Sequence, residues 1–178
     1  MTSIEATPET SLCVGCGLCC DGTLFARARS EQPDEQWRLS ALGFDFEDFN
    51  DAKWFKQPCP MASCGTCTIY ADRPAVCRSF RCSLLKSFEA GEIDRATATE
   101  KITTAKALLA AVVADDPDAG SYRYRKEAKL AQAFESADQP TRRNIGPKLV
   151  RLAALETFLS RWFTKKDEKR EGEGADFS

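Results

Sequence analysis

Apolar side chains in the second half of the chain recur with the 3.6-residue period of a helix. One series has spacings of four and three residues and comprises Ala98, Ile102, Ala105, Leu109 and Val112. Residues three and four apart share a helix face, so this series predicts one buried face, and Thr97 with Glu100 has the pattern of a capping box. Similar stripes over 124–134 and 149–162 predict two more helices. We therefore expect three helices within a helical region spanning residues 91–164.

The first half of the chain lacks this period and predicts short strands joined by loops. Aromatic and β-branched residues over 53–55 and 66–70, and a weak alternation over 23–29, favour strands. The segment 34–42, which Gly43 follows, favours a short helix. These elements predict an α+β fold, in which an irregular, cysteine-rich half with short strands packs against about three C-terminal α-helices.

Changes in composition divide the chain into four parts. Residues 1–11 form an acidic and weakly patterned leader, which we expect to be flexible, and residues 165–178 form a charged tail that we expect to be disordered. Between them we expect a cysteine-cluster region over 12–90 and the helical region over 91–164. Within the first of these, Pro74 is expected to open a helical turn.

The composition is that of one folded domain and excludes several chemistries. The 178 residues are 43% hydrophobic and 29% charged, with a net charge of −2, which favours neither a disordered chain nor a nucleic-acid partner. The sequence contains no histidine, so Ser-His-Asp and Cys-His catalysis and histidine-ligated zinc are excluded. The longest apolar run, 107–114, is far shorter than the roughly 20 residues of a membrane span, and the N-terminus has no secretory pattern. We therefore expect a cytoplasmic protein that does not enter a membrane.

Nine cysteines form two groups within the first 82 residues. The first group has the spacing C-x2-C-x2-C-C and the second C-x4-C-x2-C-x9-C-x4-C. In a reducing cytosol clustered cysteines favour metal ligation over disulfides, and two thiolates separated by two residues can bind one ion from a tight turn. Because adjacent side chains diverge, Cys19 and Cys20 are expected to serve different metals, a bridge or different edges of a cluster. The spacing predicts that the protein binds metal through its cysteines.

These motifs resemble those of the YkgJ-type cysteine-cluster family, whose signature is CxxCxxCC. The resemblance rests on the run from Cys13 to Cys20, on Cys59-Pro60 and on the segments 67–70 and 73–82. That family is described as a zinc- or iron-chelating domain, and a similar domain occurs in a flagellin lysine N-methylase. The resemblance implies eight metal ligands: Cys13, Cys16, Cys19, Cys20, Cys59, Cys67, Cys77 and Cys82.

Two positions depart from the family pattern. Cys64 is additional to the eight cysteines of that pattern, and it is either a spare thiol or a ligand in place of Cys59 or Cys67. Arg81 stands where many members have Pro. These departures leave open whether Cys64 is a ligand.

The residues leave the metal open between zinc and iron. Eight thiolates form two sets of four, which suits two zinc sites or a 4Fe–4S cluster together with a second metal. The C-x2-C-x2-C run and Cys59-Pro60 are similar to ferredoxin spacing, whereas the C-x4-C pair after Pro74 suits zinc equally well. Metal held by four thiolates carries negative charge, so we interpret Arg78 as a donor to a thiolate sulfur. The alternative is that Arg78 is an ordinary surface arginine.

Three functions fit these observations. The first is a cytosolic cysteine-cluster protein that binds zinc or iron through thiolates in a structural or accessory role. The second, which the resemblance suggests, is an iron–sulfur electron-transfer or accessory component of a protein-modifying enzyme such as a lysine methylase. The third is a module whose helical half docks a protein partner. No nucleotide-binding or methyl-donor motif is visible, so a self-sufficient enzyme is not expected. Basic residues over 122–129 and 142–151 are the candidates for nucleic-acid contacts, but a solvated surface is the favoured interpretation.

Overall fold

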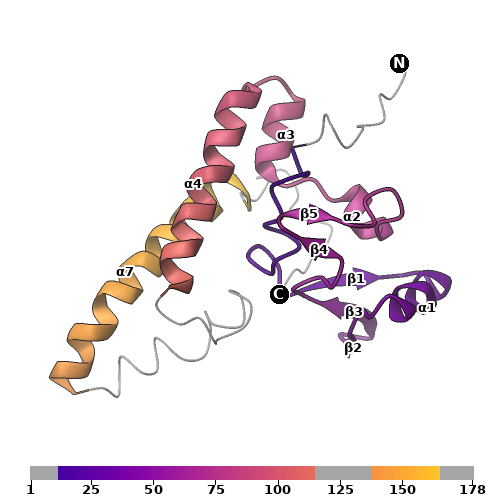
Figure 1. Ribbon diagram of the computed structural model, residues 1–178, viewed down its shortest axis with the longest axis horizontal. Coiled ribbons are helices and arrows are strands. Elements are labelled where there is room, and N and C mark those ends of the chain that lie inside the picture. Colours follow the sequence, from indigo (N-terminus) through magenta and orange to yellow (C-terminus); the bar gives the residue numbers. More distant parts are fainter. Residues whose placement is uncertain (1–11, 115–137, 165–178) are drawn as a thin grey trace.

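Strands occupy the first half of the chain and helices the second, so the predicted α+β fold class is confirmed (Figure 1). The structure, a computed structural model, describes residues 12–114 and 138–164. Two long helices, α4 (Arg95–Val113) and α7 (Gln139–Trp162), lie side by side and form an arm beside the body that contains the strands.

The body contains a three-stranded antiparallel sheet with the order β1-β3-β2. Its strands are β1 (Arg27–Ser30), β2 (Phe46–Phe49) and β3 (Ala52–Lys56). Phe55 of the central strand is fully buried and packs with Phe44 and with Leu39 of helix α1 (Pro33–Ala41). The Phe44 and Phe55 rings meet edge to face with their centres 5.1 Å apart, an arrangement that the ring quadrupoles favour. This small core holds the sheet and α1 together.

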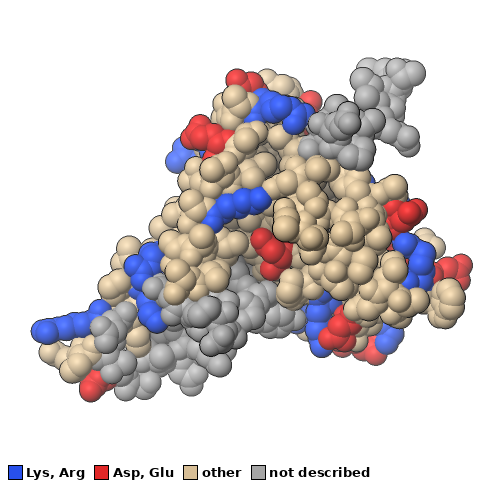
Figure 2. Space-filling view, viewed as in Figure 1, with Lys and Arg blue, Asp and Glu red and all other residues tan. Residues whose placement is uncertain are grey.

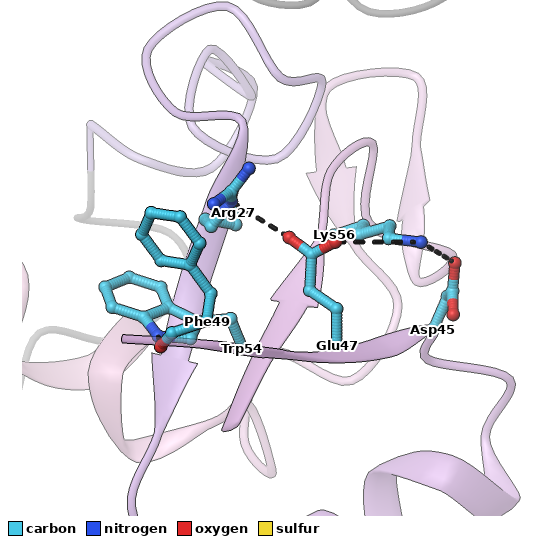
Figure 3. A network of polar contacts seen from close by, with 6 residues as sticks. All are labelled: Arg27, Asp45, Glu47, Phe49, Trp54 and Lys56. Carbon is cyan, nitrogen blue, oxygen red and sulfur yellow. Dashed lines mark hydrogen bonds and ion pairs between the residues drawn. The ribbon is translucent and has the colours of Figure 1, made fainter. Parts of the chain in front are cut away.

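Polar contacts also join the three strands, as Figure 3 shows. Arg27 Nε on β1 lies 3.0 Å from Glu47 Oε1 on β2, and the Arg27 guanidinium lies 4.1 Å from the centre of the Phe49 ring. Lys56 Nζ on β3 lies 2.9 Å from Asp45 Oδ2, just before β2. These contacts join β2 to β1 and β3. Strand β2 lies at an edge of the sheet, and the hydrophobic pattern does not predict it.

The short helix and the central strand lie close to their predicted positions. Helix α1 spans Pro33–Ala41 where 34–42 is expected, and β3 contains the predicted strand 53–55. The expected turn of helix after Pro74 is α2 (Ala75–Ser79).

Two predicted strands are shorter than the sequence pattern suggests. The segment 23–29 contributes to β1 only from Arg27, because Thr23 N donates a 2.8 Å hydrogen bond to Asp21 Oδ1 and holds the preceding residues in a turn. The segment 66–70 is a strand only over its first two residues, since the chain turns again where Asp72 N donates to Ile69 O.

The arm and the body share one hydrophobic core. Its buried residues come from both sides of residue 90: Leu18, Leu24, Leu84, Ala105, Leu155, Leu159 and Phe163. Leu84 lies on α3 (Ser83–Glu89), a short helix that the hydrophobic pattern does not predict. The cysteine-cluster region therefore packs directly on the helices.

Both long helices begin earlier than predicted. Helix α4 begins at Arg95, because Asp94 Oδ1 accepts a 2.7 Å hydrogen bond from Thr97 N and acts as the N-cap. Thr97 is therefore inside the first turn rather than at the cap. Helix α7 begins at Gln139 and continues through Pro147, although proline cannot donate the backbone hydrogen bond of a helix interior.

Four expectations lie outside the described residues: the leader 1–11, the basic residues over 122–129, the stripe over 124–134 and the tail 165–178. Among the helices of 12–114 and 138–164, none combines the length and the apolar character needed to cross a membrane. On the face shown in Figure 2, positive and negative side chains are interspersed.

Candidate metal centre

The first cysteine group lies on a loop made of two tight turns. Cys16 N donates to Cys13 O at 3.2 Å, and Cys20 N donates to Gly17 O at 2.9 Å. Gly17 has a φ of +74°, which an L side chain rarely adopts. Leu18 is 0% exposed and anchors the loop in the shared core. The first turn spans the Cys13–Cys16 step, and the second contains Cys19 and Cys20.

The β4–β5 hairpin lies against this loop. It pairs β4 (Ala62–Ser63) with β5 (Thr66–Cys67), and its tip is the Cys64-Gly65 turn, in which both residues have positive φ. Gly15 N in the loop donates a 3.1 Å hydrogen bond to Gly65 O at the tip. The loop and the hairpin are therefore joined through their backbones.

The remaining cysteines lie at a turn and at two helices. Cys59 N donates a 2.7 Å hydrogen bond to Cys20 O, which places this turn beside the end of the loop. Cys77 lies on α2, and Cys82 is the N-cap of α3, where Cys82 Sγ accepts a 3.4 Å hydrogen bond from Leu85 N.

Four of the thiols form a first cluster, as their mutual electrostatic effects show. Burial raises the pKa of Cys16 to about 11, and repulsion from Cys82 and Cys13 contributes. Burial raises the pKa of Cys19 well above its usual value, with repulsion from Cys82, Cys16, Cys20 and Cys13. Burial raises the pKa of Cys82 as well, with a contribution from Cys13. We name these residues the first thiol set: Cys13, Cys16, Cys19 and Cys82.

The other four candidate ligands form a second cluster. Burial raises the pKa of Cys20 to about 12, with repulsion from Cys59 and Cys67 and weaker repulsion from Asp21 and Cys16. Burial also raises the pKa of Cys77 to about 12, with repulsion from Cys20, Cys59 and Cys67. The pKa of Cys59 is raised by burial and by Cys67. We name these residues the second thiol set: Cys20, Cys59, Cys67 and Cys77.

The two sets do not coincide with the two groups along the sequence. Cys20 follows Cys19 directly, yet its strongest thiol neighbours are those of the second set, as expected for adjacent side chains that diverge. Cys82 is the last cysteine of the second sequence group, but its charge raises the pKa of thiols in the first set, because α3 packs in the shared core with Leu18. Cys64 is exposed at the hairpin tip.

The donor chemistry of each set fits a soft metal. Thiolate sulfur is the preferred ligand of zinc and of iron in clusters. Backbone N–H groups favour the ionised form of several of these thiols, among them Leu18 N–H at Cys16 and Leu85 N–H at Cys82. In 12–114 and 138–164 no three Cys, Asp or Glu side chains are already arranged to hold a metal ion.

Two cations lie beside the thiol sets. The charge of Lys106 on α4 lowers the pKa of Cys16, and the charge of Arg73 lowers the pKa of Cys77. Arg78, the arginine that the sequence predicts to contact a thiolate, is exposed, and its Nη1 donates a 2.8 Å hydrogen bond to Arg73 O. A contact of Arg78 with a thiolate stays a prediction. The spacing of the cysteine motifs gave no indication of Lys106, because it lies in the helical half.

Replacing Gly17 with Ala should destabilise the protein more than replacing Gly15 with Ala. Both glycines have positive φ, so each substitution costs about 1 kcal/mol of backbone strain. A Cβ at Gly17 would lie only 2.8 Å from Gly65 Cα, whereas a Cβ at Gly15 meets nothing within 4 Å. Overpacking adds about 1–3 kcal/mol at Gly17 alone. Urea denaturation of the two metal-loaded variants measures the difference, and equal losses would contradict the close approach of the hairpin to the loop.

Residues 12–107 match the model of the CxxCxxCC family, which is described as "Putative zinc- or iron-chelating domain". The matched span contains both thiol sets and ends within α4, so it includes Lys106. No curated protein and no solved structure matches the chain significantly.

Proposed function

Because the chain belongs to the CxxCxxCC family, we propose that it binds zinc or iron at two separate centres, each held by four cysteine thiolates. The observation that carries the proposal is the packing of the candidate ligands on two different cores: Cys16, Cys19 and Cys82 lie against the shared core, and Cys59 and Cys77 lie against the core around Phe55. The mutual repulsions of the thiols, which are strongest within each thiol set, support this division. Four thiolates complete a tetrahedral zinc site and equally suffice for one 4Fe–4S cluster.

We propose a structural or accessory role for these centres. A site closed by four protein sulfurs leaves no position for a substrate or a water molecule, unlike a catalytic zinc site. The metal-bound sets would cross-link the loop, the hairpin and helices α2 and α3, which otherwise consist of very short elements. Zinc would supply cross-linking alone, whereas iron would also supply electron transfer.

Metal analysis of single-cysteine variants tests the proposal. Elemental analysis and the visible spectrum of protein purified without oxygen identify the metal, because an iron–sulfur cluster is coloured and zinc is not. Cys16→Ser should empty the first set only and Cys77→Ser the second only, since each removes one of four ligands. Cys64→Ser is the matched control and should leave both centres loaded, because Cys64 belongs to neither set.

Three outcomes decide the matter. Loss of about half the metal in each of the first two variants, and no loss in the control, supports two four-thiolate centres. Equal loss in all three variants would overturn the assignment of the ligands. Wild-type protein that binds neither zinc nor iron would overturn the proposed function itself.

A further inference from the structure

Lys106 reaches from α4 to the turn between the first two cysteines. Its Nζ donates a hydrogen bond to Gly15 O, and Gly15 lies between Cys13 and Cys16. The preceding residue, Ala105, is fully buried in the same core cluster as Leu18, which lies between Cys16 and Cys19. Two consecutive residues of α4 therefore support the C-x2-C-x2-C run: Lys106 bonds the segment between its first two cysteines, and Ala105 shares a core with the segment that follows.

The Lys106 amine also lies where the hairpin tip meets the loop. Gly15 N donates to Gly65 O at 3.1 Å. A Cβ built on Gly65 would lie 3.1 Å from Gly15 O and 3.2 Å from Lys106 Nζ. Three segments distant in sequence thus converge on one ammonium group: the loop, the hairpin and α4.

The charge of Lys106 has the sign that a thiolate centre requires. The Lys106 ammonium group is hydrogen-bonded to Gly15 O in the Cys13–Cys16 turn, so a positive charge lies beside the first thiol set. Four thiolates around a divalent metal leave net negative charge in a poorly solvated place, where a nearby cation is most effective. Loading of the first set would strengthen the attraction between the loop and α4.

We propose that Lys106 is the positioning residue of the first metal centre: it fixes the Cys13–Cys16 turn through Gly15 O and offsets the negative charge of the loaded set. The inference rests on the proposed function. It adds that the helical half sets the affinity of the first centre through Lys106, while the second centre, beside Arg73, is independent of that lysine.

The test compares Lys106→Met with Lys101→Met in zinc-loaded protein. Lys106→Met keeps most of the side-chain length but removes the donor and the charge. Lys101 lies on the same helix, and its Nζ contacts Glu100 and the Trp162 ring instead of the loop. Zinc affinity of each centre is measured by competition with a chelator, with Cys77→Ser added to isolate the first set and Cys16→Ser to isolate the second.

Lys106→Met should weaken zinc binding at the first set by about 10–100-fold, the usual loss when a group supporting a metal ligand is removed. The second set should change by less than about threefold, and Lys101→Met should leave both sets near the wild-type affinity. Added salt should weaken the first set less in Lys106→Met than in wild type, because the screened attraction is absent. Lys106→Arg, which keeps the charge, should recover part of the loss.

The possible failures are distinguishable. Unchanged affinity of the first set in Lys106→Met, or an equal loss at both sets, would overturn the positioning role while leaving the two metal centres in place. Should Lys106→Met fail to fold, Lys106→Gln, a shorter neutral donor, is measured in its place, and wild-type affinity at the first set would overturn the role of the charge. Absence of zinc from the wild-type protein would instead count against the proposed function.

Discussion

Removal of the metal with a strong chelator is expected to unfold much of residues 12–82. The elements that carry the thiols are short: β4 and β5 have two residues each and α2 has five, whereas an isolated hairpin is marginal in water. A structural zinc site contributes an apparent binding free energy of about 10–16 kcal/mol, against a total stability of about 5–15 kcal/mol for a domain. The loss of two such centres exceeds what the remaining core can supply.

Hydrogen exchange with and without chelator measures this effect. Amide protection over residues 24–70 should fall strongly, whereas the contact between α4 and α7 should keep more of its protection, because Ala105, Leu155 and Leu159 remain packed there. Restoring zinc should restore the protection, which controls for irreversible damage. Equal protection of residues 24–70 with and without chelator would mean that the small core around Phe55 keeps this region folded without metal.

Acidification is expected to release the metal steeply. Burial raises the pKa of Cys16 to about 11 and the pKa of Cys20 and of Cys77 to about 12, so these thiols carry protons at neutral pH and each must lose its proton to bind metal. Three thiols of each set have raised pKa values. Each centre therefore exchanges at least three protons for one metal ion, and its affinity falls about 1,000-fold per pH unit.

The pH dependence has opposite signs for metal affinity and for the stability of the metal-free protein. Between pH 8 and pH 6 the loaded protein loses about 10⁶-fold in metal affinity at each centre, because protons compete for sulfur. Without metal, the buried neutral thiols favour whatever fraction stays folded below their ordinary pKa of 9.0, and this contribution is lost as pH rises toward 11 to 12. Chelator competition at several pH values measures how metal affinity changes per pH unit. A release of one proton or fewer per bound metal ion would show that few of these thiols bind it.

The sequence predicted the fold class and some of its elements because those elements have local causes. Helix α1 ends before Gly43, and the apolar face of α4 follows the helical period through Ala98 and Ala105. Helix α3 and strand β2 escaped prediction, since seven and four residues are too few to display a period. Their positions depend on tertiary contacts, such as burial of Leu84 in the shared core.

The candidate site was predictable in its residue types but not in its arrangement. The family resemblance implied the eight candidate ligands, yet the placement of Cys82 with the first set depends on how α3 packs. The role of Arg78 stays a prediction from its place among the cysteines, and the fold adds two cations beside the thiols, Arg73 and Lys106. Lys106 is distant from the cysteine run along the chain, so only the fold reveals its contact with Gly15.

The order of the ligands along the chain makes one centre enclose the other. The second thiol set, from Cys20 to Cys77, falls wholly between Cys19 and Cys82 of the first set. Metal at the first set thus closes a long chain loop that contains both sheets, and closing a loop of this length restricts the unfolded chain by about 4 kcal/mol in the chain-entropy view. The first centre therefore cross-links the outer ends of this loop, and the second cross-links residues within it. Loss of Cys82 would remove the cross-link between the ends of the loop, whereas loss of Cys77 would remove only the cross-link within it.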